Sequence, residues 1–105
     1  MTSTLAQAAP ALSSEVIAVF CQRNHIRKLS LFGSILTPRF RPESDVGILV
    51  EFEPGRTPGL LDFVRLKLEL SEMMGRDVDL RTPGDISRYF RDRVVSGAEV
   101  QYERV

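Results

Sequence analysis

Residues 31–52 read LFGSILTPRFRPESDVGILVEF and contain the two features that decide the fold. The first is the pair Gly33 and Ser34, which ends the alternating segment RKLSLFGS (27–34), typical of a strand. The second is Asp45, which heads DVGILVEF (45–52), a run rich in β-branched and aromatic residues. Alternation there predicts one face with Val46, Ile48, Val50 and Phe52, and another with Asp45, Gly47, Leu49 and Glu51. We therefore expect two strands joined by a short helical segment, SILTPRF.

Helical periodicity lies on both sides of these strands. The segment SSEVIAVFCQRNHI (13–26) opens with serines and an acid, and LLDFVRLKLELSEMMG (60–75) has a longer apolar stripe with Gly75 as its expected C-cap. RDVDLRT (76–82) fits a short third strand with Val78 and Leu80 inward. DISRYFRDRVVSG (85–97) indicates a last helix, and EVQYERV (99–105) a closing edge strand. The predicted fold class is α/β (α+β), a small mixed β-sheet covered by helices.

Length and composition further restrict the number of domains and the class of protein. The chain of 105 residues, 43% hydrophobic and 27% charged, predicts one small globular domain, which we assign to residues 13–105. Residues 1–12 are interpreted as a flexible lead-in, because they lack the basic region and the long apolar stretch of a secretory signal. No run approaches the roughly 18 apolar residues of a membrane-spanning helix. The single Cys21 favours a buried hydrophobe in a reducing, cytoplasmic setting.

The charge pattern argues against a nucleic-acid-binding protein. The formal net charge is zero, so the chain has no global basic field that would collect a polyanion. Two local basic clusters remain, RNHIRK (23–28) and RYFRDR (88–93). We interpret both as solvated helix faces, with a local polyanion contact as the alternative.

Residues 31–52 also carry the candidate chemistry. A glycine–serine turn between a strand and a helical segment points its N–H groups forward, an arrangement that binds phosphate, although most such pairs end a strand for steric reasons. Asp45 and Asp79 fall on separate strands, and carboxylates of neighbouring strands can converge on a hard cation. Either aspartate alone would be an ordinary surface residue.

Taken together, Gly33 and Ser34 after the first strand, Asp45 at the head of the second and Asp79 on a later strand resemble the nucleotidyltransferases of the DNA polymerase beta superfamily. The resemblance is closest to the minimal nucleotidyltransferase (MNT) domains, and it covers roughly residues 14–104. It implies a polymerase beta-like fold and transfer of AMP from ATP to a hydroxyl. It also implies that Asp45 and Asp79 are catalytic and bind Mg²⁺ (or Mn²⁺), and that Gly33 and Ser34 hold the ATP phosphates.

The resemblance further implies a protein partner. Family members of this size are often antitoxins that bind a HEPN-type ribonuclease toxin and in some cases adenylylate it on a tyrosine. We therefore expect a nucleotide and a HEPN-type toxin as partners, in a homo- or hetero-oligomer. The candidate contact surfaces are the long helix around residues 63–74 and the aromatic-basic segment 88–93.

One departure from the family pattern concerns metal binding. Gly47 stands where the family has the second aspartate of an Asp-x-Asp pair, and losing that carboxylate should weaken metal binding. A structural reason for Gly47, a bulge or a close approach of backbone, is the alternative. Glu51 lies on the same face but about 13 Å along the strand, so it cannot substitute.

A second departure follows Ser34, where many relatives carry an arginine. Here Arg39 or Arg41 would reach a triphosphate or be solvated, and we favour solvated. His25 is expected to be a capping or surface residue. Two functions follow from these departures: an AMP-transferring enzyme weakened by Gly47, or a catalytically silent, antitoxin-like protein that neutralises its partner by occlusion.

Overall fold

The first helix begins and ends at local signals in the sequence. The computed structural model describes residues 13–104. The Ser13 hydroxyl accepts a hydrogen bond from the N–H of Val16 and caps α2 (Ser14–Arg23). His25 follows with a φ of 58°, a left-handed conformation that turns the chain into β1 (Ile26–Phe32). The helix expected over 13–26 therefore ends earlier than predicted.

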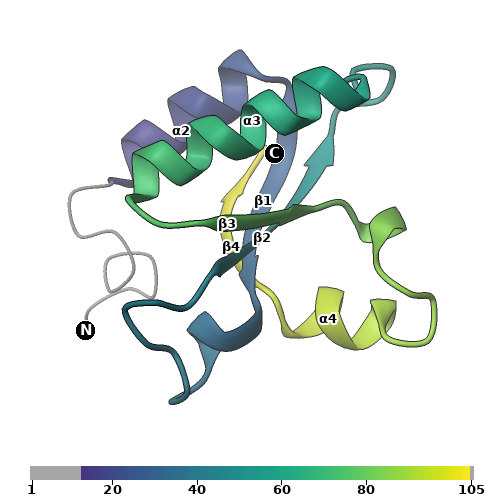
Figure 1. Cartoon of the computed structure of the whole chain (residues 1–105). Coiled ribbons are helices and arrows are strands. Elements are labelled where there is room, and N and C mark those ends of the chain that lie inside the picture. The colour runs from purple at the N-terminus through teal and green to yellow at the C-terminus, as the bar shows by residue number, and fades with distance from the viewer. Residues whose placement is uncertain (1–12, 105) are drawn as a thin grey trace.

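The remaining elements follow in the expected order (Figure 1). They are the 3₁₀ turn η1 (Gly33–Leu36), β2 (Val46–Phe52), α3 (Leu60–Met74), β3 (Val78–Arg81), the 3₁₀ turn η2 (Pro83–Asp85), α4 (Arg91–Gly97) and β4 (Glu99–Glu103). The strands form one mixed sheet in the order β3-β2-β1-β4. β1 is antiparallel to both β2 and β4, whereas β2 and β3 are parallel. The predicted mixed sheet covered by helices is thus confirmed.

The main core lies between the sheet and the helices α2 and α3, which run side by side over one face (Figure 1). Alternating residues of β1, β2 and β3 point into this core, as predicted: Leu29, Leu31, Val46, Ile48, Val50, Val78 and Leu80. Cys21 of α2 is fully buried there. Burial raises the pKa of its thiol to about 12, because a thiolate would be desolvated. The interpretation of Cys21 as a small hydrophobe is consistent with this environment.

The segment after β3 corrects one prediction. The helix expected over 85–97 begins only at Arg91, because Thr82 and Asp85 form a capping box that closes η2, and Ile86 continues in an extended conformation. The side chain of Arg91 donates hydrogen bonds to the carbonyls of Pro83 and Ile86, which ties the start of α4 back to this turn. Within residues 13–104, none of the helices has the length and apolar character required to cross a membrane.

Candidate functional site

The glycine–serine pair forms a turn at the end of β1, as the sequence predicts. Gly33 has a φ of 85°, a left-handed conformation that favours glycine, and it begins η1. The carbonyl of Ser34 accepts hydrogen bonds from the N–H and the hydroxyl of Thr37, at 2.9 and 2.8 Å. The helical segment expected after this pair is therefore a single 3₁₀ turn.

The strand register brings the candidate residues to one end of the sheet. Phe32 of β1 pairs with Gly47 of β2, and Gly47 pairs with Asp79 of β3, so the three residues form one row across the sheet. Asp45 lies two residues before Gly47 and immediately before β2 begins, and the alternation along the strand places it on the same face as Gly47. Because β1 ends where β2 and β3 begin, the turn at Gly33 lies at this same end.

The two predicted metal ligands share a surface pocket. Asp45 and Asp79 both line a pocket of about 490 Å³ along the outer edge of β3. The other lining residues come from α3 and from β3 and its preceding turn: Lys67, Leu68, Ser71, Asp77, Val78 and Arg81. Gly33 and Ser34 are not among the residues that line it. Asp45 and Asp79 thus line one pocket, and the turn at Gly33 and Ser34 lies outside it.

The positively charged side chain of Arg81 contacts Asp79. The Nε of Arg81 lies 3.1 and 3.2 Å from the two carboxylate oxygens of Asp79, and both side chains remain nearly half exposed. Such half-exposed pairs contribute only about 0–1 kcal/mol, so this contact can be displaced. The sequence analysis missed Arg81. The available signal was its position two residues after Asp79 on a strand, which places both on one face.

Gly47 sits where the backbones of β1 and β2 approach each other closely. A Cβ at this position would lie 2.5 Å from the carbonyl oxygen of Phe32 and 3.0 Å from two carbons of its ring. Real Cβ atoms essentially never come within 3.0 Å of a neighbour, so no side chain fits without a shift of β1. The structural alternative for Gly47, a close approach of backbone, is therefore what the structure contains.

The donor set fits one divalent ion better than two. Among the residues that the structure describes, no group of three His, Cys, Asp or Glu side chains could hold a metal ion. The carboxylates of Asp45 and Asp79 are of the oxygen type that Mg²⁺ and Mn²⁺ prefer, and Gly47, the register partner of Asp79, offers none. A single ion that takes its other ligands from water and nucleotide phosphates is compatible with this pair.

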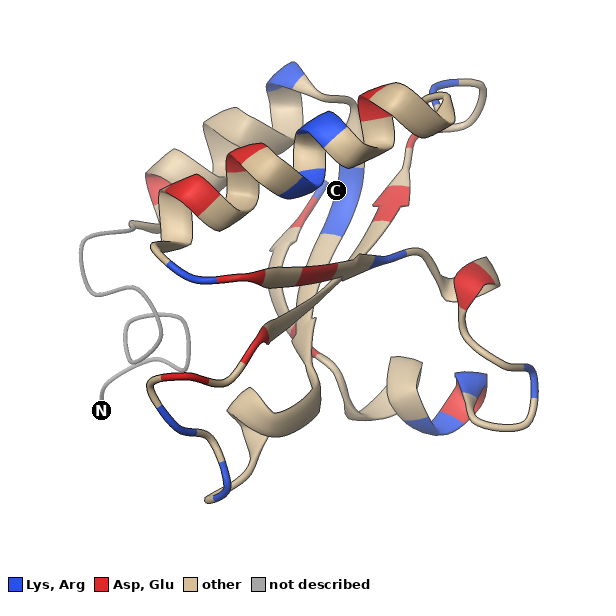
Figure 2. Ribbon diagram, viewed as in Figure 1, with Lys and Arg blue, Asp and Glu red and all other residues tan. Residues whose placement is uncertain are grey.

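The other predicted candidates lie at the surface. Arg39 and Arg41 are both exposed, and the hydrogen bonds they donate to Thr37 and Ser44 come from their backbone N–H groups. His25 is half-exposed, with Nδ1 3.8 Å from a carboxylate oxygen of Glu53. Figure 2 shows acidic and basic residues interspersed along α3 and the sheet rather than gathered by sign. This mixed surface agrees with the absence of a global basic field.

Comparison with known proteins gives the family. Residues 13–100 match the family model described as "Nucleotidyltransferase domain". A protein of Methanocaldococcus jannaschii named as a protein adenylyltransferase, MJ0435, is 40% identical over 76 residues, which are 72% of this chain and 80% of that protein.

Solved structures agree with the fold. A structure described as a minimal nucleotidyltransferase is 35% identical, with a TM-score of 0.66, covering 81% of this chain and 85% of that one. An MNT antitoxin in complex with a tri-AMPylated HEPN toxin from Shewanella oneidensis has a TM-score of 0.63 at 20% identity, covering 87% and 70% of the two chains. The resemblance drawn from Gly33, Ser34, Asp45 and Asp79 is confirmed: the chain belongs to the nucleotidyltransferase domain family.

Proposed function

We propose that this protein transfers AMP from ATP to a tyrosine hydroxyl of a HEPN-type toxin, at a rate reduced by Gly47. The observation that carries the proposal is that Asp45 and Asp79 line one pocket, at the end of the sheet where the Gly33 turn lies. The relative named as a protein adenylyltransferase, and the AMPylated toxin in a structural neighbour, support the substrate and the acceptor.

In this proposal the acceptor oxygen bonds to the α-phosphorus of ATP, the bond from that phosphorus to the bridging oxygen breaks, pyrophosphate leaves and the hydroxyl proton passes to water. Asp45 and Asp79 would hold Mg²⁺ or Mn²⁺, which neutralises charge on the phosphate oxygens. The N–H groups of the turn at Gly33 and Ser34 would orient the distal phosphates. Arg81 would have to leave Asp79 when the ion binds.

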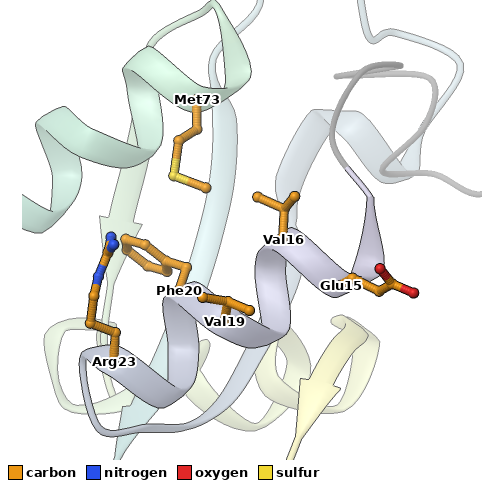
Figure 3. A pocket seen from close by; sticks show the side chains of 6 residues that line it. All are labelled: Glu15, Val16, Val19, Phe20, Arg23 and Met73. Atoms are coloured by element: carbon orange, nitrogen blue, oxygen red, sulfur yellow. The ribbon is translucent and has the colours of Figure 1, made fainter.

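An apolar groove between α2 and α3 is the first candidate for contact with the partner. Figure 3 shows Val16 and Phe20 of α2 and Met73 of α3 pointing toward one another across a pocket of about 440 Å³. Apart from this groove, α3 exposes four large apolar residues: Leu60, Leu61, Val64 and Leu68. The expected surface over 63–74 is therefore extended toward the start of α3.

The segment 88–93 is the second candidate contact surface. Tyr89 is 79% exposed and Phe90 is 56% exposed, and the guanidinium of Arg88 lies 5.2 Å from the centre of the Tyr89 ring. Exposed aromatic residues next to arginine are typical anchors of protein interfaces.

Occlusion without chemistry is the second candidate function. Gly47 favours it, because the family's second carboxylate is absent and a side chain at this position would collide with Phe32. In this alternative the protein keeps its fold and its apolar groove, and neutralises the toxin by covering it.

The test is transfer of label from ATP labelled at the α-phosphate to a co-purified HEPN-type protein, with Mg²⁺ or Mn²⁺. We expect slow labelling that Asp45→Asn and Asp79→Asn reduce by about 10²-fold or more, because an electrostatic contact made in the transition state is lost. Glu103→Gln, an exposed residue of β4 at the opposite edge of the sheet from β3, is the matched control and should not change the rate. A stable complex without label would support occlusion instead, and labelling that survives both substitutions would contradict the assigned site.

A further inference from the structure

Arg76 contacts the loop that leads into Asp45, although no pattern in the sequence singles it out. It follows Gly75, the left-handed C-cap of α3, and precedes β3. Its Nη1 lies 3.3 Å from the carbonyl oxygen of Arg41 and 3.5 Å from that of Ser44. Its guanidinium carbon lies 4.7 Å from the centre of the Phe40 ring, a cation–π distance. One side chain thus contacts three residues of the loop between η1 and β2.

The contacted loop is itself closed into a turn. The N–H of Ser44 donates to the carbonyl of Arg41 at 3.0 Å, and the hydroxyl of Ser44 accepts from the N–H of Arg41 at 3.1 Å. Arg76 binds the carbonyls at both ends of this turn. The guanidinium therefore fixes the turn as a unit against the end of α3.

The peptide groups before and after Asp45 are hydrogen-bonded to residues 76 and 77. The preceding peptide presents the Ser44 carbonyl to Arg76, and the following peptide donates the Val46 N–H to the Asp77 carbonyl at 3.0 Å. Among residues 13–104, no side chain forms a hydrogen bond or ion pair with the exposed carboxylate of Asp45, so its position depends on its backbone. We infer that Arg76 is a positioning residue that holds Asp45 at the head of β2. The effect of Arg76 on the rate of AMP transfer rests on the proposed function. Its effect on the position of Asp45 does not.

Hydrogen exchange tests the structural content directly. In Arg76→Met, which keeps the apolar stem and removes the donors, we expect the Ser44 amide to exchange about five- to tenfold faster, because a charged hydrogen-bond donor is lost from a partly exposed site. Phe40→Leu should produce a smaller increase, since it removes the ring contact alone. Arg56→Met is the matched control: Arg56 is exposed in the turn after β2, where its N–H bonds to the Glu53 carbonyl, at the opposite end of that strand. Its substitution should leave exchange over 37–46 unchanged.

Kinetics of the labelling reaction test the catalytic consequence. Arg76→Met should lower kcat more than it raises the KM for ATP, because the turn at Gly33 and Ser34 is not displaced, and Arg76→Lys should recover part of kcat. Unchanged exchange over 37–46 in Arg76→Met would overturn the inference. If the unmodified protein transfers no AMP, the proposed function fails, and the exchange result still decides whether Arg76 positions Asp45.

Discussion

Adding a single methyl group at Gly47 should destabilise the protein measurably. In Gly47→Ala the new Cβ would lie 2.5 Å from the Phe32 carbonyl oxygen, whereas ordinary contacts begin at 3.4 Å. The carbonyl belongs to the backbone of β1, so the contact can be relieved only if the two strands separate by about 1 Å. Overpacking of this kind costs about 1–3 kcal/mol.

The expected net effect is smaller than the overpacking cost. Replacing glycine reduces the conformational entropy of the unfolded chain, which stabilises by about 0.4–1 kcal/mol. We therefore expect the free energy of unfolding of Gly47→Ala to fall by about 0–2.6 kcal/mol, with a central value of about 1.3 kcal/mol that corresponds to a fall in Tm of about 5–10 °C for a domain of this size. Urea and thermal unfolding followed by far-UV circular dichroism measure both quantities.

Gly97→Ala is the matched control for this measurement. Gly97 is the last residue of α4, its φ is not in the left-handed region, and a Cβ there would have no atom within 4 Å. It should be neutral or stabilising by up to about 1 kcal/mol. If Gly47→Ala is as stable as Gly97→Ala, the strands do not approach as closely as described, and the structural reason given for Gly47 is wrong.

Two other predictions concern charge and burial. Arg81→Gln should lower the Kd for Mn²⁺, measured by calorimetry, by about 1.4- to fivefold, because a competing pair worth about 0.2–1 kcal/mol is removed from Asp79. Arg56→Gln should not change this Kd, and weaker binding in Arg81→Gln would contradict a competing role. The Cys21 thiol, with its pKa raised to about 12 by burial, should stay protonated up to pH 9, so a thiol reagent should react with it only after unfolding. Rapid modification of the native protein at pH 8 would refute that assignment.

The sequence predicts the elements of this fold well where periodicity and local signals agree. The alternation over 45–52 and the stripe over 60–75 predict β2 and α3 closely, and Gly75 adopts the left-handed φ of 69° expected of a C-cap. The helix over 85–97 was predicted too long, because its helical spacing continues through residues that a capping box holds in another conformation. The hydrogen-bonded turn at Thr82 and Asp85 overrides the local helix propensity of this segment.

The candidate site was only partly predictable, for a different reason. The motif names Gly33, Ser34, Asp45 and Asp79, and the structure brings the two aspartates into one pocket. Arg76 carries no motif, because it acts through contacts made by tertiary structure. Arg81 carries none either, and its only signal is its position two residues after Asp79 on the strand. Gly47 could be read as a lost ligand or as a close backbone approach, and only the register with Phe32 reveals the close approach.

The close approach at Gly47 and the contacts of Arg76 act on the same few residues. Gly47 lets β1 draw close to the start of β2, while Arg76 and the Asp77 carbonyl hold the peptides on either side of Asp45. The head of β2 is therefore held by the backbone of β1 on one side and by residues 76 and 77, which precede β3, on the other. A second carboxylate could enter only by loosening this packing, so Gly47→Asp should gain metal affinity and lose stability together. Comparing Gly47→Asp with Gly47→Asn separates the effect on metal affinity from the effect on stability. The two side chains have nearly the same volume, and only the aspartate adds a charge for the ion.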